Sequence, residues 1–301
     1  MTWFLTEGLF ETQKQGINKS NLDPFFTEGF SGLISVIGLV FVSYGGLTKV
    51  ASAAEEVDDP SLKIPLGMSL SLLVGTVLYT LGALVAVALL PPDILHEDLA
   101  PIHSAAETVL PSAGVALVVL AALAAFASAV NAGILAAARY PMAMARDGLF
   151  PEVAGRLSRY GTPAFGVIVT GVAIALVVLL LDAEAIAKLA SAFVLLTLGL
   201  LNIAVLVLRA SHIQSYAPAF KAPLYPLTQF IGIIISVFLI FQLGATAMLF
   251  VVFVFVAGWT WHRLYASGKS KRAGAIRQVF ERWGADADPE LDREMSAAMA
   301  G

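Results

Sequence analysis

The residues best suited to bind a small molecule are Ser43, Tyr44, Gly45, Gly46 and Thr48, which interrupt an otherwise apolar run. Adjacent glycines favour the unwinding of a helix. Unwound backbone has unpaired N–H and C=O groups, which membranes tolerate only where they line a polar cavity or are buried in protein. Such helix ends direct N–H dipoles at a carboxylate and carbonyl oxygens at an ammonium group or a cation. Paired glycines also allow another helix to pack closely, and the sequence leaves both interpretations open.

Three other polar side chains inside apolar runs, Lys49, Ser128 and Asn131, are candidates for a cavity or an ion site. A lysine at the centre of a lipid-exposed helix costs about 2.5 to 3.5 kcal/mol, so Lys49 must face water, protein or the membrane interface. It is either a proton-linked or cation-replacing ammonium, or it snorkels or pairs with Glu55 or Glu56. Ser128 and Asn131 either face the same cavity or bond to neighbouring helices.

The remaining residues exclude several classes of function. The chain has no cysteine, which excludes disulfides and Cys-based metal sites. His96 and His103 lie near Glu97, Asp98 and Glu107, a pattern that indicates a solvated loop. The apolar runs lack the paired acids, His clusters or Ser with a nearby base that an enzyme needs. We therefore expect no catalytic residues, no metal, no cofactor and no nucleic-acid partner.

The elements that position these residues are membrane-spanning helices. The 301 residues are 58% hydrophobic and 13% charged, with a mean hydropathy of +0.83, which predicts an all-α integral membrane fold. About 20 apolar residues cross roughly 30 Å of hydrocarbon as a helix. Seven runs come near that length: 30–54, 64–90, 112–138, 164–181, 186–208, 227–243 and 246–262. The first is predicted to be broken at Tyr44–Gly46.

The distribution of basic residues predicts the orientation of these spans, because cationic loops stay in the cytoplasm. Lys and Arg concentrate in the loops on one side and in the tail 263–301, whereas the opposite side has only Lys14 and Lys19. Residues 1–29 are therefore expected to be an extracellular polar segment, with the C-terminus in the cytoplasm. In the tail, 273–283 has the spacing of an amphipathic helix on the inner leaflet, and the acidic end is expected to be disordered.

Several motifs occur in the order found in a known family. The segment 41–46, followed by Ala54-Glu55-Glu56-Val57, Pro60 and Ile64-Pro65, resembles the sixth helix and following loop of amino acid permeases of the amino acid, polyamine and organocation superfamily. The most specific match is 131–151, which looks like that family's eighth helix and its basic loop. Residues 160–163 are similar to the start of the ninth helix, and 216–226 to the loop before the eleventh.

The resemblance implies a transporter of two five-helix inverted repeats plus two further helices, working by alternating access. The seven spans of this chain would be helices six to twelve, the second repeat and the two appended helices. The resemblance places the substrate ammonium near the carbonyls of 43–46, with Tyr44 and Thr48 shaping specificity. Many relatives have an aromatic gate where this chain has Val42, so Val42 and the adjacent Phe41 are the candidate gate. The coupling ion is expected to be H⁺ or Na⁺.

The leading hypothesis is therefore secondary-active amino acid transport by the C-terminal half of such a permease. The chain is expected to be either one part of a split transporter, whose partner chain supplies the first five helices, or a truncated form. The span count alone also fits a seven-helix receptor or photosensor. However, the last span, 246–262, lacks the lysine that a retinal pigment needs. A further alternative is a fragment with no transport of its own.

Overall fold

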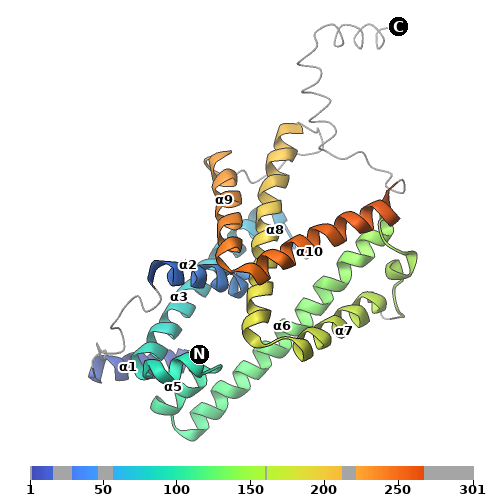
Figure 1. Ribbon diagram of the computed structural model, residues 1–301. Coiled ribbons are helices and arrows are strands. Elements are labelled where there is room, and N and C mark those ends of the chain that lie inside the picture. The colour runs from blue at the N-terminus through green and yellow to red at the C-terminus, as the bar shows by residue number, and fades with distance from the viewer. Residues whose placement is uncertain (1, 16–28, 47–56, 160, 212–221, 268–301) are drawn as a thin grey trace, which may run out of the picture. The chain divides into compact units, whose positions relative to one another are not determined.

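The structure, a computed structural model, describes residues 2–15, 29–46, 57–159, 161–211 and 222–267. Every regular element in these ranges is helical, and Figure 1 follows them along the chain. The chain divides into two compact units. Unit 1 comprises Met1–Leu33 and Gly46–Ala137, and unit 2 comprises Ile34–Gly45 and Ala138–Gly301. The predicted all-helical architecture is confirmed for the described residues.

The apolar runs of the sequence form the long helices. Four stretches are long and apolar enough to cross a bilayer: α3 (Pro60–Leu89), α6 (Ser112–Arg146), α8 (Ala183–Ser211), and α10 (Ala245–Trp261) continued by η5 (His262–Ala266). Three shorter apolar helices are α2 (Gly29–Val40) continued by η2 (Phe41–Tyr44), α7 (Ala164–Leu180) and α9 (Leu227–Gln242). Large apolar side chains cover their outer surfaces, with Leu179 80% and Leu180 77% exposed. Such surfaces suit lipid rather than water.

Unit 1 contains a helix that the sequence analysis did not expect. Residues 1–29 were predicted only as a polar segment, but α1 (Thr2–Gln15) is helical and buries its short apolar patch. Phe4 and Leu5 join a core with Val85 of α3 and with α5 (Pro101–Val109). A Cβ on Gly8 would come 2.4 Å from Val85 Cγ1. The contact between α1 and α3 therefore depends on the small glycine.

Asp98 organises the connection between α4 (Pro92–Glu97) and α5 in unit 1. A hydrogen bond with the Ser104 side chain holds the pKa of Asp98 below its usual value, and the Ala100 N–H, 2.7 Å from Oδ1, lowers it further. Nearby His103 adds a smaller effect in the same direction. The stabilising contribution of a lowered carboxyl pKa is present above about pH 4 and is lost as pH falls through the lowered value.

We therefore expect acid to loosen this connection while the apolar helices persist. Hydrogen exchange at the Ala100 and Ser104 amides, corrected for its intrinsic pH dependence, should show lower protection at pH 3 than at pH 6. Asp98→Ala should lower protection at pH 6 as well, because it removes the carboxylate acceptor. Asp93→Ala, in the first turn of α4, is the matched control and should leave these amides unchanged. Equal protection at both pH values in the unsubstituted chain would contradict the expectation.

Unit 2 has its core where α8, α9 and α10 meet. Figure 1 shows α8 and α9 running side by side, and the buried Leu195 and Leu239 pack together with neighbours from α10. Gly244 joins α9 to α10 at φ 94°, a left-handed conformation that glycine adopts without steric strain. The later residues of α2 and η2 pack against this core through Ile34, Leu39 and Phe41. The predicted break in the first apolar run is thus attached to the α8–α10 core.

Candidate functional site

The first apolar helix changes its geometry at Phe41, three residues before the predicted break at Tyr44–Gly46. The α-helix ends at Val40, a 3₁₀ helix covers Phe41–Tyr44, and a turn follows at Gly45 and Gly46. The Gly45 N–H donates to the Val42 carbonyl at 3.1 Å, which closes the 3₁₀ segment. In a 3₁₀ helix each N–H bonds three residues back instead of four, so the change of geometry leaves one carbonyl at the junction without its α-helical donor.

A buried serine donates a hydrogen bond at this junction. The Leu39 carbonyl is the group that an α-helical Ser43 N–H would have bonded, and it accepts a hydrogen bond from Ser191 Oγ at 2.7 Å. Ser191 lies on α8 and is 0% exposed. An unpaired carbonyl in an apolar environment is costly. The hydroxyl of Ser191 therefore stabilises the junction between the α-helical and 3₁₀ geometries.

Two further contacts hold this part of α2 against the end of α9. Ser35 Oγ donates to the Gln242 carbonyl at 3.1 Å. This carbonyl is one of those in the last turn of α9, which have no partner within the helix. A Cβ on Gly38 would lie 3.4 Å from the Leu243 side chain, an ordinary close contact. The residues before the break are therefore fixed to α8 and α9, which provides a rigid support for the residues that follow.

Replacing Ser191 with alanine should destabilise unit 2. The change removes the hydroxyl that donates to the Leu39 carbonyl, which costs about 1 to 3 kcal/mol and should lower Tm by about 3 to 10 °C. The measurement is thermal unfolding of the purified protein in detergent. Thr197→Ala is the matched control on α8, because Thr197 Oγ1 donates to the Phe193 carbonyl of its own helix. An equal Tm for the two variants would show that the hydroxyl of Ser191 has no special role.

The two glycines of the break have different surroundings. A Cβ on Gly45 would lie 3.1 Å from Val194 Cγ2 of α8 and 3.2 Å from the Val42 carbonyl oxygen, whereas a Cβ on Gly46 would have nothing within 4 Å. The close-packing interpretation therefore applies to Gly45. Gly46 is exposed, and among the described residues no atom would crowd a side chain at that position.

The other candidate residues of the break differ in how far their side chains are buried. Phe41 packs against the α8–α10 core, whereas Val42 is 37% exposed. Ser43 is exposed and Tyr44 is partly buried. Phe41 and Val42 both stay candidates for the gate: Phe41 is partly buried against the core, and Val42 is the more exposed of the two. Thr48 and Lys49 lie outside the described residues.

Ser128 and Asn131 lie on α6, within unit 1, and both are exposed. A separation of three residues places them on one face of the helix. They are the two polar side chains in the otherwise apolar stretch 113–138 of this helix, and their role as a cavity or ion site stays a prediction. Within the described part of the chain, no group of three or more His, Cys, Asp and Glu residues could hold a metal ion.

Comparison with known proteins identifies the family. Residues 8–270 match the family described as Amino acid permease. The chain belongs to the amino acid permease family. Among curated relatives, branched-chain amino acid permease BcaP of Bacillus subtilis (strain 168) is 30% identical over 261 residues, which cover 85% of this chain and 55% of the relative. The vacuolar cationic amino acid transporter 2 of Arabidopsis thaliana is 34% identical over 201 residues, 66% of this chain and 31% of the relative.

A third relative broadens the range of substrates found among similar proteins. The methylthioribose transporter of Bacillus subtilis (strain 168) is 29% identical over 242 residues, covering 80% of this chain and 52% of that protein. This permease chain thus spans from about a third to about half of the length of these relatives. The resemblance is confirmed, and the chain is a multi-pass membrane protein by family and by its apolar helices.

Sequence reasoning missed the two serines that hold the break in place, Ser35 and Ser191. Both lie in apolar helices, where a hydroxyl commonly bonds across helices. That signal was present in the sequence, because Ser191 stands between two alanines in the run 186–208. It does not identify the acceptor, which lies 152 residues away along the chain.

Proposed function

We propose that this permease chain forms part of a secondary-active transporter that moves amino acids across the cell membrane by alternating access. The observation that carries the proposal is the break at Phe41–Gly46, whose junction carbonyl is bonded by Ser191 while Gly46 remains uncrowded. Freed backbone groups at such a break suit the carboxylate and ammonium of an amino acid. The substrate would bind at Ser43, Tyr44, Gly45, Gly46 and Thr48, with Val42 as the gate.

The proposed topology has seven spans, with the N-terminus outside and the C-terminus in the cytoplasm, as the distribution of Lys and Arg favours. These spans would be the second inverted repeat and two appended helices. The other wall of the substrate site would come from the part of the relatives' length that this chain does not span. That part would be carried either on the same polypeptide or on a partner chain.

The substrate class is proposed at the level of the family. One relative is named for branched-chain amino acids, one for cationic amino acids and one for methylthioribose. A backbone site recognises the α-ammonium and α-carboxylate that all amino acids share, whereas the side chain would be selected by Val42, Tyr44 and Thr48. Coupling to H⁺ or Na⁺ would supply the driving force.

The proposal is tested by uptake into proteoliposomes. The chain is reconstituted alone and together with a five-helix first half of a relative, and uptake of labelled leucine, arginine and methylthioribose is measured under an imposed H⁺ or Na⁺ gradient. We expect gradient-dependent uptake of an amino acid only in the combined preparation. No uptake by the combined preparation would contradict transport, and uptake by the chain alone would contradict the requirement for a second wall.

A further inference from the structure

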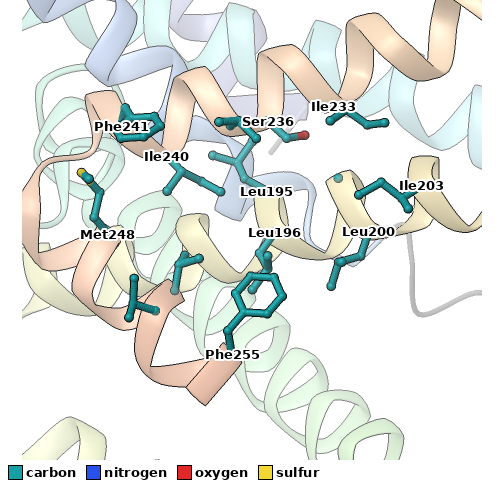
Figure 2. A pocket seen from close by; sticks show the side chains of 14 residues that line it. Leu195, Leu196, Leu200, Ile203, Ile233, Ser236, Ile240, Phe241, Met248 and Phe255 are labelled. Carbon is teal, nitrogen blue, oxygen red and sulfur yellow. The ribbon is translucent and has the colours of Figure 1, made fainter. Parts of the chain in front are cut away.

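An apolar groove lies in unit 2, lined by residues of α8, α9 and α10. Figure 2 shows it: Leu200 and Ile203 line it from α8, Ile233 from α9, and Met248 and Phe255 from α10. Its volume is about 250 Å³. Leu200, Ile203 and Phe255 are about half exposed, so the groove opens to the surroundings of the helices and is not an internal void.

No polar atom contributes to the wall of this groove. Ser236 is one of the lining residues, but it is only 6% exposed. A Cβ built on Gly199 of α8 would lie 3.4 Å from Ser236 Cβ, so the two helices are close at this point. An ordered water needs two to four polar partners, so water does not fill the groove. Because these helices lie in a bilayer, the molecule available at the opening is a lipid acyl chain.

A cation lies farther along α8, beyond the residues that line the groove. Arg209 lies six residues beyond Ile203 on α8, which is roughly 9 Å along a helix. Its Cζ lies 4.3 Å from the centroid of the Tyr225 ring, just before α9. Tyrosine is typical of the depth of lipid headgroups, and a guanidinium binds phosphate oxygens in a bidentate manner. The ends of α8 and α9 thus bring a phosphate ligand to the level where a headgroup lies.

We infer that this groove binds an anionic phospholipid, with one acyl chain between α8, α9 and α10 and the phosphate near Arg209. Lipid tails are as apolar as leucine side chains, so burial by itself gives no preference for this site over bulk lipid. Retention comes from packing in the groove, to which the flexible Met248 can adapt, and from the charge at Arg209. The inference depends on membrane insertion of the chain and is independent of the proposed transport.

Photolabelling tests the occupant directly. The full chain is placed in nanodiscs of phosphatidylcholine with a small share of phosphatidylglycerol that has a diazirine in one acyl chain, and labelled residues are mapped by mass spectrometry. We expect labels concentrated on the groove walls, with unlabelled phosphatidylglycerol competing better than phosphatidylcholine. Equal competition by the two lipids would overturn the inference. Labels spread equally over the groove and over Leu179 and Leu180 of α7 would also overturn it. An unlabelled groove would show that protein covers it, and this result too would overturn the inference.

Two pairs of variants separate the acyl chain from the headgroup. Leu200→Trp should block the groove and remove most of its labelling, whereas Leu201→Trp, at an exposed neighbour that does not line it, should leave labelling unchanged. Arg209→Gln should lower the preference for phosphatidylglycerol about fivefold, and Arg156→Gln, at the end of η4 (Glu152–Gly155), should not. Arg209→Gln leaves the groove walls intact, so it tests the headgroup contact even if Leu200→Trp fails to fold. An unchanged preference in Arg209→Gln would overturn the headgroup assignment.

Discussion

Replacing Gly166 with alanine should separate α7 from α6 and strongly destabilise unit 2. A Cβ on Gly166 would lie 2.7 Å from the Ala138 carbonyl oxygen and 2.8 Å from Ala138 Cα. Both atoms belong to the backbone of α6, so no side chain can rotate away and the helices themselves must move. Ala138 is 0% exposed, and the contact is therefore fully packed. Overpacking of this kind costs about 3 kcal/mol, which corresponds to a loss of about 10 °C in Tm.

Gly171 on the same helix provides the control, because a Cβ there would meet nothing within 4 Å. Gly171→Ala should leave Tm unchanged or raise it slightly, since alanine is the better helix former by about 0.5 to 1 kcal/mol. Thermal unfolding and size-exclusion chromatography of the two variants in detergent give the comparison. Similar Tm values for Gly166→Ala and Gly171→Ala would mean that α6 and α7 do not approach each other as closely as the structure places them.

The apolar helices were predictable because hydrophobic length is a property of the sequence alone. The run 164–181 corresponds to α7 at Ala164–Leu180, and the run 227–243 to α9 at Leu227–Gln242. By contrast, α1 was not predicted, since residues 2–15 have only three successive apolar residues at the start and charged residues soon after. Their helix is stabilised by contacts of Phe4 and Leu5 with α3 and α5. Those contacts depend on the tertiary fold and leave no periodic pattern in the sequence.

The candidate site shows the same division between local and long-range information. Gly45 and Gly46 predict a break because glycine lowers helix stability wherever it occurs, and the described helix changes to 3₁₀ geometry at Phe41–Tyr44, just before the two glycines. The sequence could not separate the roles of the two glycines, because the neighbour that crowds Gly45 is Val194 of α8. The same holds for Phe41, whose packing against the α8–α10 core depends on residues far away in the sequence.

Replacing Gly46 with alanine should abolish most transport while leaving the fold intact. The added methyl group has open space on the protein side, with nothing within 4 Å, so we expect Tm to stay within about 2 °C of the unsubstituted chain. In the proposed site, however, the methyl group would occupy the space where the substrate approaches the freed backbone. A displacement of about 1 Å can reduce turnover 100-fold, and we expect uptake to fall at least about tenfold.

Gly45→Ala is the variant to compare with Gly46→Ala, because its added Cβ would lie 3.1 Å from Val194 Cγ2. A small repacking of that side chain should cost about 1 kcal/mol and lower Tm by about 3 °C. Uptake in the combined proteoliposomes and Tm in detergent are measured for both variants. If Gly46→Ala keeps full uptake while Gly45→Ala loses uptake and stability together, the glycine pair serves helix packing alone. A loss of uptake without a loss of stability in Gly46→Ala assigns that residue to the substrate site, because helix packing offers no other reason for the effect.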